Sequence, residues 1–473
     1  MSKTTTIKAF HEAIAKGETT FLNQVNYHLN QIEKNKDLNA FVNVFADDAI
    51  ANANELDKKA KNNKKVGRLA GVVISIKDNI CYENHITTAG SLILEGYKSP
   101  FSATAVQKLI DEDAIIIGTT NCDQFGMGSS SVNSHYGPVK NAIGENLISG
   151  GSSGGAAVSV QSDQCMIALG SDTGGSVRQP AAFTNTIGFK PSYGAVSRYG
   201  LMAYGSSFDQ IGIIGHTNED VALIYDVIQG KDEMDSTSID VLPFDSRNTN
   251  NKETKLKLAY VPAMFEGDGD LMDSNKAALA LLKQKHELIA YDFEYMQYLV
   301  PCYYILSTAE ASSNLSRYDG VRYGYRSKTT PNLESLYVNS RSEGFGSEVK
   351  KRIMLGTFVL SEGYFDAYFT KALKVRNLLL QRINDVLIDV DGLILPVSPT
   401  KPWKLDKKIT DPIQIYMSDI YTVLANLVGN PCITLPFEDQ SDNSPIKTSL
   451  QLMTKHGEDK AIFYLADSLT KVF

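Results

Sequence analysis

The chain of 473 residues carries 46 Lys and Arg against 54 Asp and Glu, a net charge of −8, and 43% of its residues are hydrophobic. This balance is typical of a globular protein with an extensive core. It argues against independent nucleic-acid binding, which needs a strongly basic surface. The short basic clusters at 58–61 and 350–352 fit solvated helix faces better than a binding surface.

The five cysteines are scattered and never form a Cys-x-x-Cys pair, so the sequence predicts neither a disulfide framework nor a zinc site. The seven histidines show no metal-ligand spacing either, and we expect no metal. The first residues lack the apolar stretch of a secretory signal, and no apolar run approaches the roughly 18 residues of a membrane span. We therefore expect a protein of the cytoplasm that does not attach to a membrane.

Residues 1–65 have the pattern of helices, because apolar side chains recur at helical spacing through 7–14 and 21–32, and 47–62 continue that pattern. The period then changes. Residues 69–76 form a short β-branched run, which predicts a buried strand with Lys77 at its end.

Helices and strands alternate after this point. We expect helices over 103–112 and 155–162 and strands over 114–118 and 166–170. Because the strands are continuous apolar runs, the pattern predicts an α/β fold with a large mixed, mostly parallel central β-sheet flanked by helices on both faces.

The second half of the chain continues the alternation. Residues 346–389 are strongly helical, as one long helix or two, whereas 230–255 and 326–345 look like loops. Neither loop has the composition of an interdomain linker, so we predict one domain over 1–473 with residues 1–65 packed on it, although the length permits two. The other expected elements are strands at 257–261, 392–396, 432–436 and 450–453 and helices at 273–288 and 459–469.

Two glycine-rich segments each contain a serine. Residues 150–155 read GGSSGG around Ser152, and residues 170–180 read GSDTGGSVRQP around Ser176. A serine hydroxyl is a poor nucleophile until a base removes its proton, and neither segment contains a histidine. Lys77 can be that base if burial keeps its amine neutral. A phosphate-binding loop is disfavoured because no Gly-Lys-Ser/Thr follows the glycines. The pattern predicts a Lys-Ser-Ser site for acyl transfer.

In residue type and spacing these segments resemble the amidase-signature family of serine hydrolases, and the similarity extends over nearly the whole chain. The resemblance implies the fold of that family, with Ser176 as nucleophile, Ser152 as relay serine and Lys77 as base. It also implies a cis peptide bond between Gly151 and Ser152. Lys77 would take the proton of Ser152 while Ser152 takes that of Ser176, and the chain reversed would protonate the leaving ammonia.

The turn before Ser176 is expected to bind the oxyanion, because two of its residues are glycines without side chains to block the backbone N–H groups. The donors expected from this turn are Thr173, Gly174, Gly175 and Ser176. The residues expected to support the catalytic groups are Asp172, Arg178 and Ser153.

Further segments, among them 188–194, 206–212 and 310–320, are similar to family members that release ammonia from glutamine. That resemblance implies a pocket in which Asp419 faces the substrate ammonium and Arg352 grips its carboxylate. The other residues that it places in the pocket are Tyr303, Met127 and Gly128.

The same resemblance implies a heterotrimer with two further subunits, B and C. One partner would use ATP and Mg²⁺ to activate the glutamate of Glu-tRNA(Gln), which the ammonia converts to Gln-tRNA(Gln). We expect no cofactor in this chain and tRNA contacts mainly through the partner, in keeping with the acidic net charge. The alternative is a stand-alone amidase for small or fatty amides. A non-catalytic assembly protein is disfavoured by the intact Lys77, Ser152 and Ser176.

Overall fold

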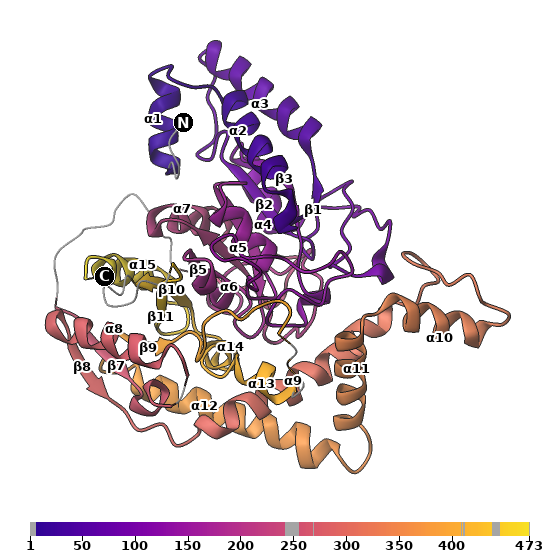
Figure 1. Cartoon of the computed structure of the whole chain (residues 1–473), viewed down its shortest axis with the longest axis vertical. Coiled ribbons are helices and arrows are strands. Elements are labelled where there is room, and N and C mark those ends of the chain that lie inside the picture. Colours follow the sequence, from indigo (N-terminus) through magenta and orange to yellow (C-terminus); the bar gives the residue numbers. More distant parts are fainter. Residues whose placement is uncertain are drawn as a thin grey trace.

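One sheet of eleven strands runs through the computed structural model (Figure 1), which describes residues 6–241, 255–267, 269–407, 409, 412–437 and 445–472. The strand order is β1-β3-β2-β4-β6-β5-β10-β11-β9-β7-β8. The strands are β1 Phe41–Val44, β2 Val73–Lys77, β3 Ile115–Thr120, β4 Ile167–Asp172, β5 Ile187–Lys190, β6 Gln210–Gly215, β7 Lys257–Tyr260, β8 Glu287–Ala290, β9 Gly392–Pro396, β10 Cys432–Phe437 and β11 Thr448–Met453.

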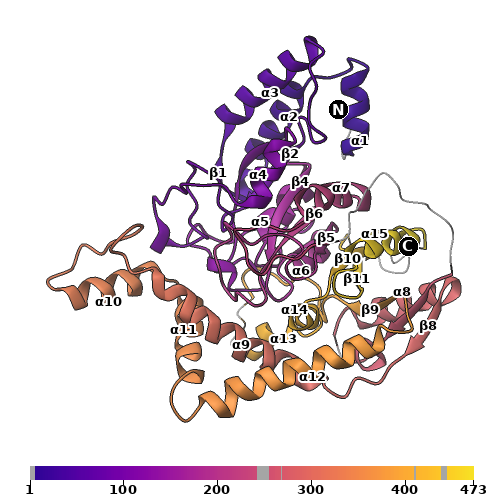
Figure 2. The same ribbon diagram turned by 180° about the vertical axis from the view of Figure 1, so that it is seen from behind.

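Helices cover the sheet and form a projection beside it. The helices are α1 Ile7–Ala15, α2 Phe21–Lys34, α3 Ala46–Lys61, α4 Thr104–Asp111, α5 Gly154–Gln161, α6 Arg178–Phe183, α7 Asn218–Ile228, α8 Met272–Lys285, α9 Leu299–Asn314, α10 Leu333–Gly344, α11 Ser347–Val359, α12 Lys371–Val386, α13 Pro412–Met417, α14 Val423–Val428 and α15 Asp459–Thr470. In Figures 1 and 2 the projection consists of α9 to α12, and α10 lies at its outer end.

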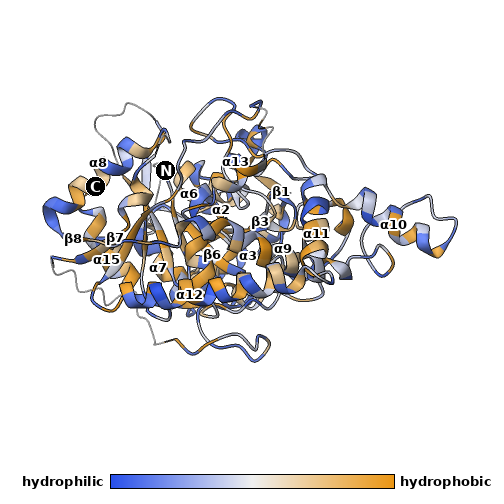
Figure 3. Ribbon diagram, turned by 90° about the horizontal axis from the view of Figure 1, so that it is seen from below, coloured by the Kyte–Doolittle hydropathy of each residue, from blue (hydrophilic) through white to orange (hydrophobic). Residues whose placement is uncertain are grey.

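The central strands are buried on both faces. Every residue of β2, β3, β4 and β6 is buried, and the apolar colouring of β6 is visible in Figure 3. α5 packs on β2, β3, β4 and β6, while α7 packs on β5 and β6 and contacts α15. Burial of all successive side chains requires cover on both faces, since neighbouring side chains point to opposite sides of a strand. The prediction of a large mixed sheet flanked by helices is confirmed.

The expected parallel majority is wrong. Of the ten strand pairings described, four are parallel and six antiparallel. The parallel pairs group as β3-β2-β4 and β9-β7-β8, and antiparallel pairs join the two groups. A continuous apolar run indicates that a strand is buried on both faces. In this fold helices cover both faces of the antiparallel strands as well. Strand direction therefore did not follow from the apolar runs.

The parallel group β3-β2-β4 positions the catalytic candidates. Ile76 of β2 is paired with Leu169 of β4, so the two strands end side by side. Lys77 is the last residue of β2, and β4 ends at Asp172, shortly before Ser176. The carboxyl ends of parallel strands lie at one edge of a sheet, which is where ligands bind in open α/β sheets.

Two segments differ from their predicted structure. Residues 326–345, expected to be a loop, contain α10, whose first turn is closed by reciprocal hydrogen bonds between Asn332 and Ser335. Few of its residues are buried, so it lacks the apolar stripe that would have predicted it. Within residues 1–65, the strand β1 adds antiparallel to β3 between α2 and α3.

Other expectations are met or lie partly outside the described residues. Residues 346–389 form two α-helices, with a turn over 360–364 and a π-helix over Phe365–Thr370 between them. Of the expected loop 230–255, residues 242–254 lie outside the description. Strands from both halves of the chain share the sheet. The extent of the domain, 1–473, remains a prediction.

Candidate active site

Lys77 lies at the centre of the candidate site, at the end of β2. Its side chain is fully buried, and Nζ lies 2.7 Å from Ser152 Oγ and 2.9 Å from Ser153 Oγ. Burial lowers the pKa of the Lys77 amine because a charged ammonium loses its hydration there. A neutral amine within hydrogen-bond distance of a serine hydroxyl has the arrangement that a general base requires.

Ser152 is presented by the loop that leads into α5. The peptide bond between Gly151 and Ser152 is cis, as the resemblance implied. The Gly151 N–H donates to Gln179 Oε1 over 2.9 Å, which ties the loop to α6. A Cβ on Gly151 would lie 2.4 Å from a carboxylate oxygen of Asp123, so the loop takes this path only with glycine there.

Ser176 stands in the turn between β4 and α6. Its backbone carbonyl accepts a 3.1 Å hydrogen bond from the Ser153 N–H, so the two glycine-rich segments are joined directly. The residue is 7% exposed, whereas Lys77 and Ser152 are fully buried. Of the three predicted catalytic residues, the predicted nucleophile is thus the one that solvent reaches. The structure brings the three segments together, and their catalytic roles remain predictions.

The turn from Thr173 to Ser176 offers fewer free amides than predicted. The Gly175 N–H donates to Asp172 Oδ1 over 2.9 Å, and this bond removes Gly175 from the expected oxyanion donors. The Asp172 side chain, which fixes the turn, thus occupies the N–H of Gly175. In the described part of the chain, the N–H groups of Thr173, Gly174 and Ser176 have no acceptor. They remain the candidate donors.

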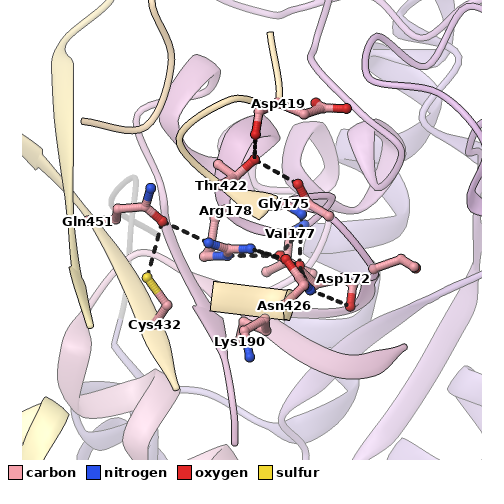
Figure 4. A network of polar contacts seen from close by, with 12 residues as sticks. Asp172, Gly175, Val177, Arg178, Lys190, Asp419, Thr422, Asn426, Cys432 and Gln451 are labelled. Atoms are coloured by element: carbon pink, nitrogen blue, oxygen red, sulfur yellow. Dashed lines mark hydrogen bonds and ion pairs between the residues drawn. The ribbon is translucent and has the colours of Figure 1, made fainter. Parts of the chain in front are cut away.

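Asp172 and Arg178 form a fully buried ion pair beneath this turn (Figure 4). Arg178 donates to both carboxylate oxygens of Asp172 over 3.1 Å and, over 2.7 Å each, to Gln451 Oε1 and Asn426 Oδ1. Burial disfavours the carboxylate, but the Arg178 guanidinium and its hydrogen bonds outweigh this and hold the pKa of Asp172 well below its usual range. The pair anchors the turn to β11 and α14.

The two residues predicted to bind the charged groups of the substrate, Arg352 and Asp419, are both buried. Arg352, on α11, is 3% exposed and donates to Glu348 Oε1 over 2.9 Å and to the Tyr204 hydroxyl over 2.7 Å. Asp419, shortly after α13, accepts 2.9 Å hydrogen bonds from Ser129 Oγ and the Tyr304 hydroxyl. Burial raises the pKa of Asp419 to about 6.

The remaining predicted pocket residues differ in their surroundings. Tyr303 packs on the turn of residues 173–176, since a Cβ on Gly174 would lie 2.5 Å from the Tyr303 hydroxyl oxygen. Met127 is fully buried in an apolar cluster with Phe125 and Tyr204. Gly128 approaches Asp123 so closely that a Cβ would lie 2.4 Å from the carboxylate carbon. Their contact with substrate stays a prediction.

Several contacts of the site could not be inferred from the sequence. Tyr304 contacts Asp419, and its ring centroid lies 5.3 Å from the Arg352 guanidinium carbon. Asp209 accepts a 2.7 Å hydrogen bond from Thr173 Oγ1, and Ser171 Oγ lies 2.9 Å from Lys77 Nζ. These contacts join residues far apart in the sequence or on adjacent strands, so local pattern did not reveal them.

Neither a metal site nor a membrane-spanning helix occurs in the part of the chain that the structure describes. Within it, no group of three or more His, Cys, Asp or Glu side chains is arranged to hold a metal ion. None of the helices among these residues combines the length and the apolar character that crossing a membrane requires.

The family model named Amidase matches residues 23–463. The chain belongs to the amidase family, and the family resemblance read from its motifs is confirmed.

Among its relatives are proteins named as the A subunit of glutamyl-tRNA(Gln) amidotransferase. The protein of Fusobacterium nucleatum is 46% identical, with 98% of this chain and 96% of the relative covered. The protein of Chlorobaculum tepidum is 45% identical over 92% of both chains. The crystal structure of the A subunit from Thermotoga maritima has a TM-score of 0.78 at 34% identity and covers 95% of this chain and 91% of the other.

More distant solved structures share the fold. A bacterial aryl acylamidase of the amidase-signature family has a TM-score of 0.85 at 20% identity, with 99% of this chain and 96% of the other covered.

Proposed function

We propose that this chain is the glutaminase subunit of a tRNA-dependent amidotransferase. The chain is 46% and 45% identical, over 98% and 92% of its length, to two proteins named as the A subunit of glutamyl-tRNA(Gln) amidotransferase, and this similarity supports the proposal. The observation that carries it in the structure is the pair Arg352 and Asp419, buried around the shared neighbour Tyr304. Free glutamine brings a carboxylate and an ammonium, and such a pair is complementary to both. A fatty amide has neither charge.

The reaction proceeds in two acyl-transfer steps. Ser176 Oγ attacks the amide carbon of glutamine while its proton passes to Ser152 and that of Ser152 to Lys77. The Thr173, Gly174 and Ser176 amides stabilise the oxyanion. The carbon–nitrogen bond breaks, the amine takes the returning proton and leaves as ammonia, and a glutamyl ester remains on Ser176. Water then cleaves this ester to glutamate and restores the serine.

The ammonia serves a reaction on a partner. We propose a heterotrimer with subunits B and C, in which a partner binds ATP, Mg²⁺ and Glu-tRNA(Gln) and this chain needs no cofactor. Conversion of Glu-tRNA(Gln) to Gln-tRNA(Gln) belongs to protein synthesis, so we place the complex in the cytoplasm. We further propose that residues 1–473 form one domain, with 1–65 packed on it.

Ammonia release tests this function directly. The chain is assayed alone and with co-purified partners, ATP and Glu-tRNA(Gln), with glutamine and with an apolar amide as substrates. We expect glutamine hydrolysis to rise when partners, ATP and tRNA are all present, and the Ser176→Ala variant to release no ammonia above background. Rapid hydrolysis of the apolar amide by the chain alone, unchanged by partners, would instead support a stand-alone amidase.

A further inference from the structure

Lys77 has a third serine neighbour outside the predicted triad. Ser171 is the next-to-last residue of β4, and its Oγ lies 2.9 Å from Lys77 Nζ, the same distance as Ser153 Oγ. The Ser171 backbone carbonyl lies 3.4 Å from the same nitrogen. The parallel pairing of β2 with β4 brings Ser171 beside Lys77, and Ser171 is only 4% exposed.

The hydrogen bonds of Ser153 fix its role toward Lys77. Ser153 Oγ lies 3.1 Å from the Ser171 carbonyl oxygen, which can only accept. Ser153 therefore donates its single hydroxyl proton there and must accept from Lys77. It cannot also deliver a proton to the amine. The other two hydroxyl groups in contact with the Lys77 nitrogen are those of Ser152 and Ser171.

Asn79 holds Ser171 in place. Asn79 follows β2 by two residues, is 2% exposed, and donates from Nδ2 to Ser171 Oγ over 2.9 Å. The Ser171 hydroxyl is thus fixed between an amide donor and the Lys77 amine. The amine itself lies among three hydroxyl oxygens, at 2.7, 2.9 and 2.9 Å, which matches the three N–H donors of an ammonium group.

We propose that Ser171 is a positioning residue for Lys77 in the proposed amidase reaction. The neutral Lys77 amine has two N–H groups and one lone pair. The Ser171 hydroxyl accepts one N–H and the Ser153 hydroxyl accepts the other, so the lone pair faces Ser152. When the Ser152 proton moves to Lys77, the buried ammonium forms three hydrogen bonds to these oxygens. They stabilise its charge, as water would at the surface. This inference rests on the proposed function, in which Lys77 is the base.

The positioning role is tested with the Ser171→Ala variant. Its kcat and KM for glutamine are measured as a function of pH, with the partner subunits present where hydrolysis requires them. We expect kcat to fall roughly 10- to 100-fold, since misplaced catalytic groups can cost on the order of 10²-fold, and KM to stay within about twofold. The ammonium loses an acceptor, so the pKa of Lys77 falls and the acidic limb of the rate profile moves to lower pH. Ser171→Thr, which keeps the hydroxyl, should restore both.

A matched control separates this role from packing. Ser75 is a fully buried serine two residues before Lys77 on β2, and its hydroxyl bonds with Ser159 Oγ and Cys165 Sγ instead. Ser75→Ala should leave kcat and the pH limb unchanged. If Ser171→Ala does not fold, Ser171→Cys keeps the volume but offers only a weak acceptor, and it should show the same losses.

A second readout does not depend on glutamine or partners. Phenylmethanesulfonyl fluoride sulfonylates an activated serine: the Ser176 Oγ–S bond forms, the S–F bond breaks, fluoride leaves, and the proton passes through Ser152 to Lys77. The pH dependence of this rate reports the same base. Wild-type rates and pH limb in Ser171→Ala, or equal losses in Ser75→Ala, would overturn the inference. If the wild type is sulfonylated with a Ser171-dependent limb but never hydrolyses glutamine, the proposed substrate fails and the positioning role stands.

Discussion

Tyr304 donates a 2.9 Å hydrogen bond from its hydroxyl to Asp419 Oδ2, and its ring centroid lies 5.3 Å from the guanidinium carbon of Arg352. Arg352 forms its ion pair with Glu348 instead of Asp419. Two buried charges of opposite sign thus share an aromatic neighbour without neutralising each other. We therefore expect a ligand that carries both an ammonium and a carboxylate to be complementary to these two groups.

The charge of Asp419 gives the proposed reaction a pH dependence. Because its pKa is about 6, the carboxylate is ionised above that pH and protonated below it. Below pH 6 we expect kcat/KM for glutamine to fall up to tenfold per pH unit more steeply than kcat/KM for an amide without an amino group. Tyr304→Phe removes a hydrogen bond that stabilises the carboxylate, so this limb should move to higher pH. Parallel profiles for both substrates would remove Asp419 from ammonium binding.

Arg352 should discriminate through the substrate carboxylate. Loss of a charged hydrogen-bonding partner costs about 1.5–3 kcal/mol, so Arg352→Ala should raise KM for glutamine roughly 10- to 100-fold. An amide lacking the carboxylate should change by less than about threefold. Because Arg352 is buried beside Glu348, the double variant Arg352→Ala/Glu348→Gln, which leaves no unpaired carboxylate, is compared with the single variant. Equal effects on both substrates would contradict the assignment.

The sequence predicted what depends on local pattern. The β-branched run before Lys77 became β2, and the glycines around Ser152 and Ser176 became the two loops at its end. Strand direction was not encoded in the apolar runs, because both faces are covered whichever way a strand runs. The capping residues Asn332 and Ser335 were the available signal for α10, on a helix that buries little.

The site could be predicted from sequence only as far as its motifs reach. Ser171 lies within such a motif, yet its contact with Lys77 arises from the pairing of β2 with β4. The loss of Gly175 as an oxyanion donor depends on where the Asp172 side chain points. Tyr304 reaches Asp419 over a separation of 115 residues. Such contacts are set by tertiary packing, which neither residue type nor spacing records.

Ser176→Ala should abolish catalysis while the fold persists. Ser176 is only 7% exposed, but the change removes a single oxygen atom, so thermal unfolding should change little. Residues of one catalytic unit are strongly non-additive, and we expect kcat to fall by about 10³-fold or more. Lys77→Ala combined with Ser176→Ala should cost little beyond the single variant, as measured by ammonia release. Near-normal turnover in Ser176→Ala would show that another group is the nucleophile.

The buried pair of Asp172 and Arg178 should govern stability. Asp172→Asn leaves the Arg178 charge uncompensated, which typically costs about 3–5 kcal/mol in the free energy of unfolding. The pKa of Asp172 is lowered in the folded state, so its stabilisation is present above the unfolded-state value near 4 and is lost only in stronger acid. Urea unfolding at pH 7 measures the change. Glu33→Gln, at the exposed pair with Lys36, is the control and should not shift the transition.

Gly174 should be irreplaceable because of Tyr303. An alanine Cβ there would lie 2.5 Å from the tyrosine Cζ and hydroxyl oxygen, so either the ring or the Gly174 amide must move. Since one misplaced oxyanion donor costs about 10²–10³ in kcat, Gly174→Ala should fall in that range with a smaller change in KM.

A double-mutant cycle identifies the cause. Tyr303→Ala removes the ring that the new methyl would strike, so Gly174→Ala should cost much less in that background than in the wild type. Tyr303→Phe keeps the ring and Cζ, and the penalty should persist there. A Gly174→Ala penalty that is the same in all three backgrounds would mean that a clash with the Tyr303 ring is not its cause. Close packing of Tyr303 on the turn would then not be what holds the amide in place.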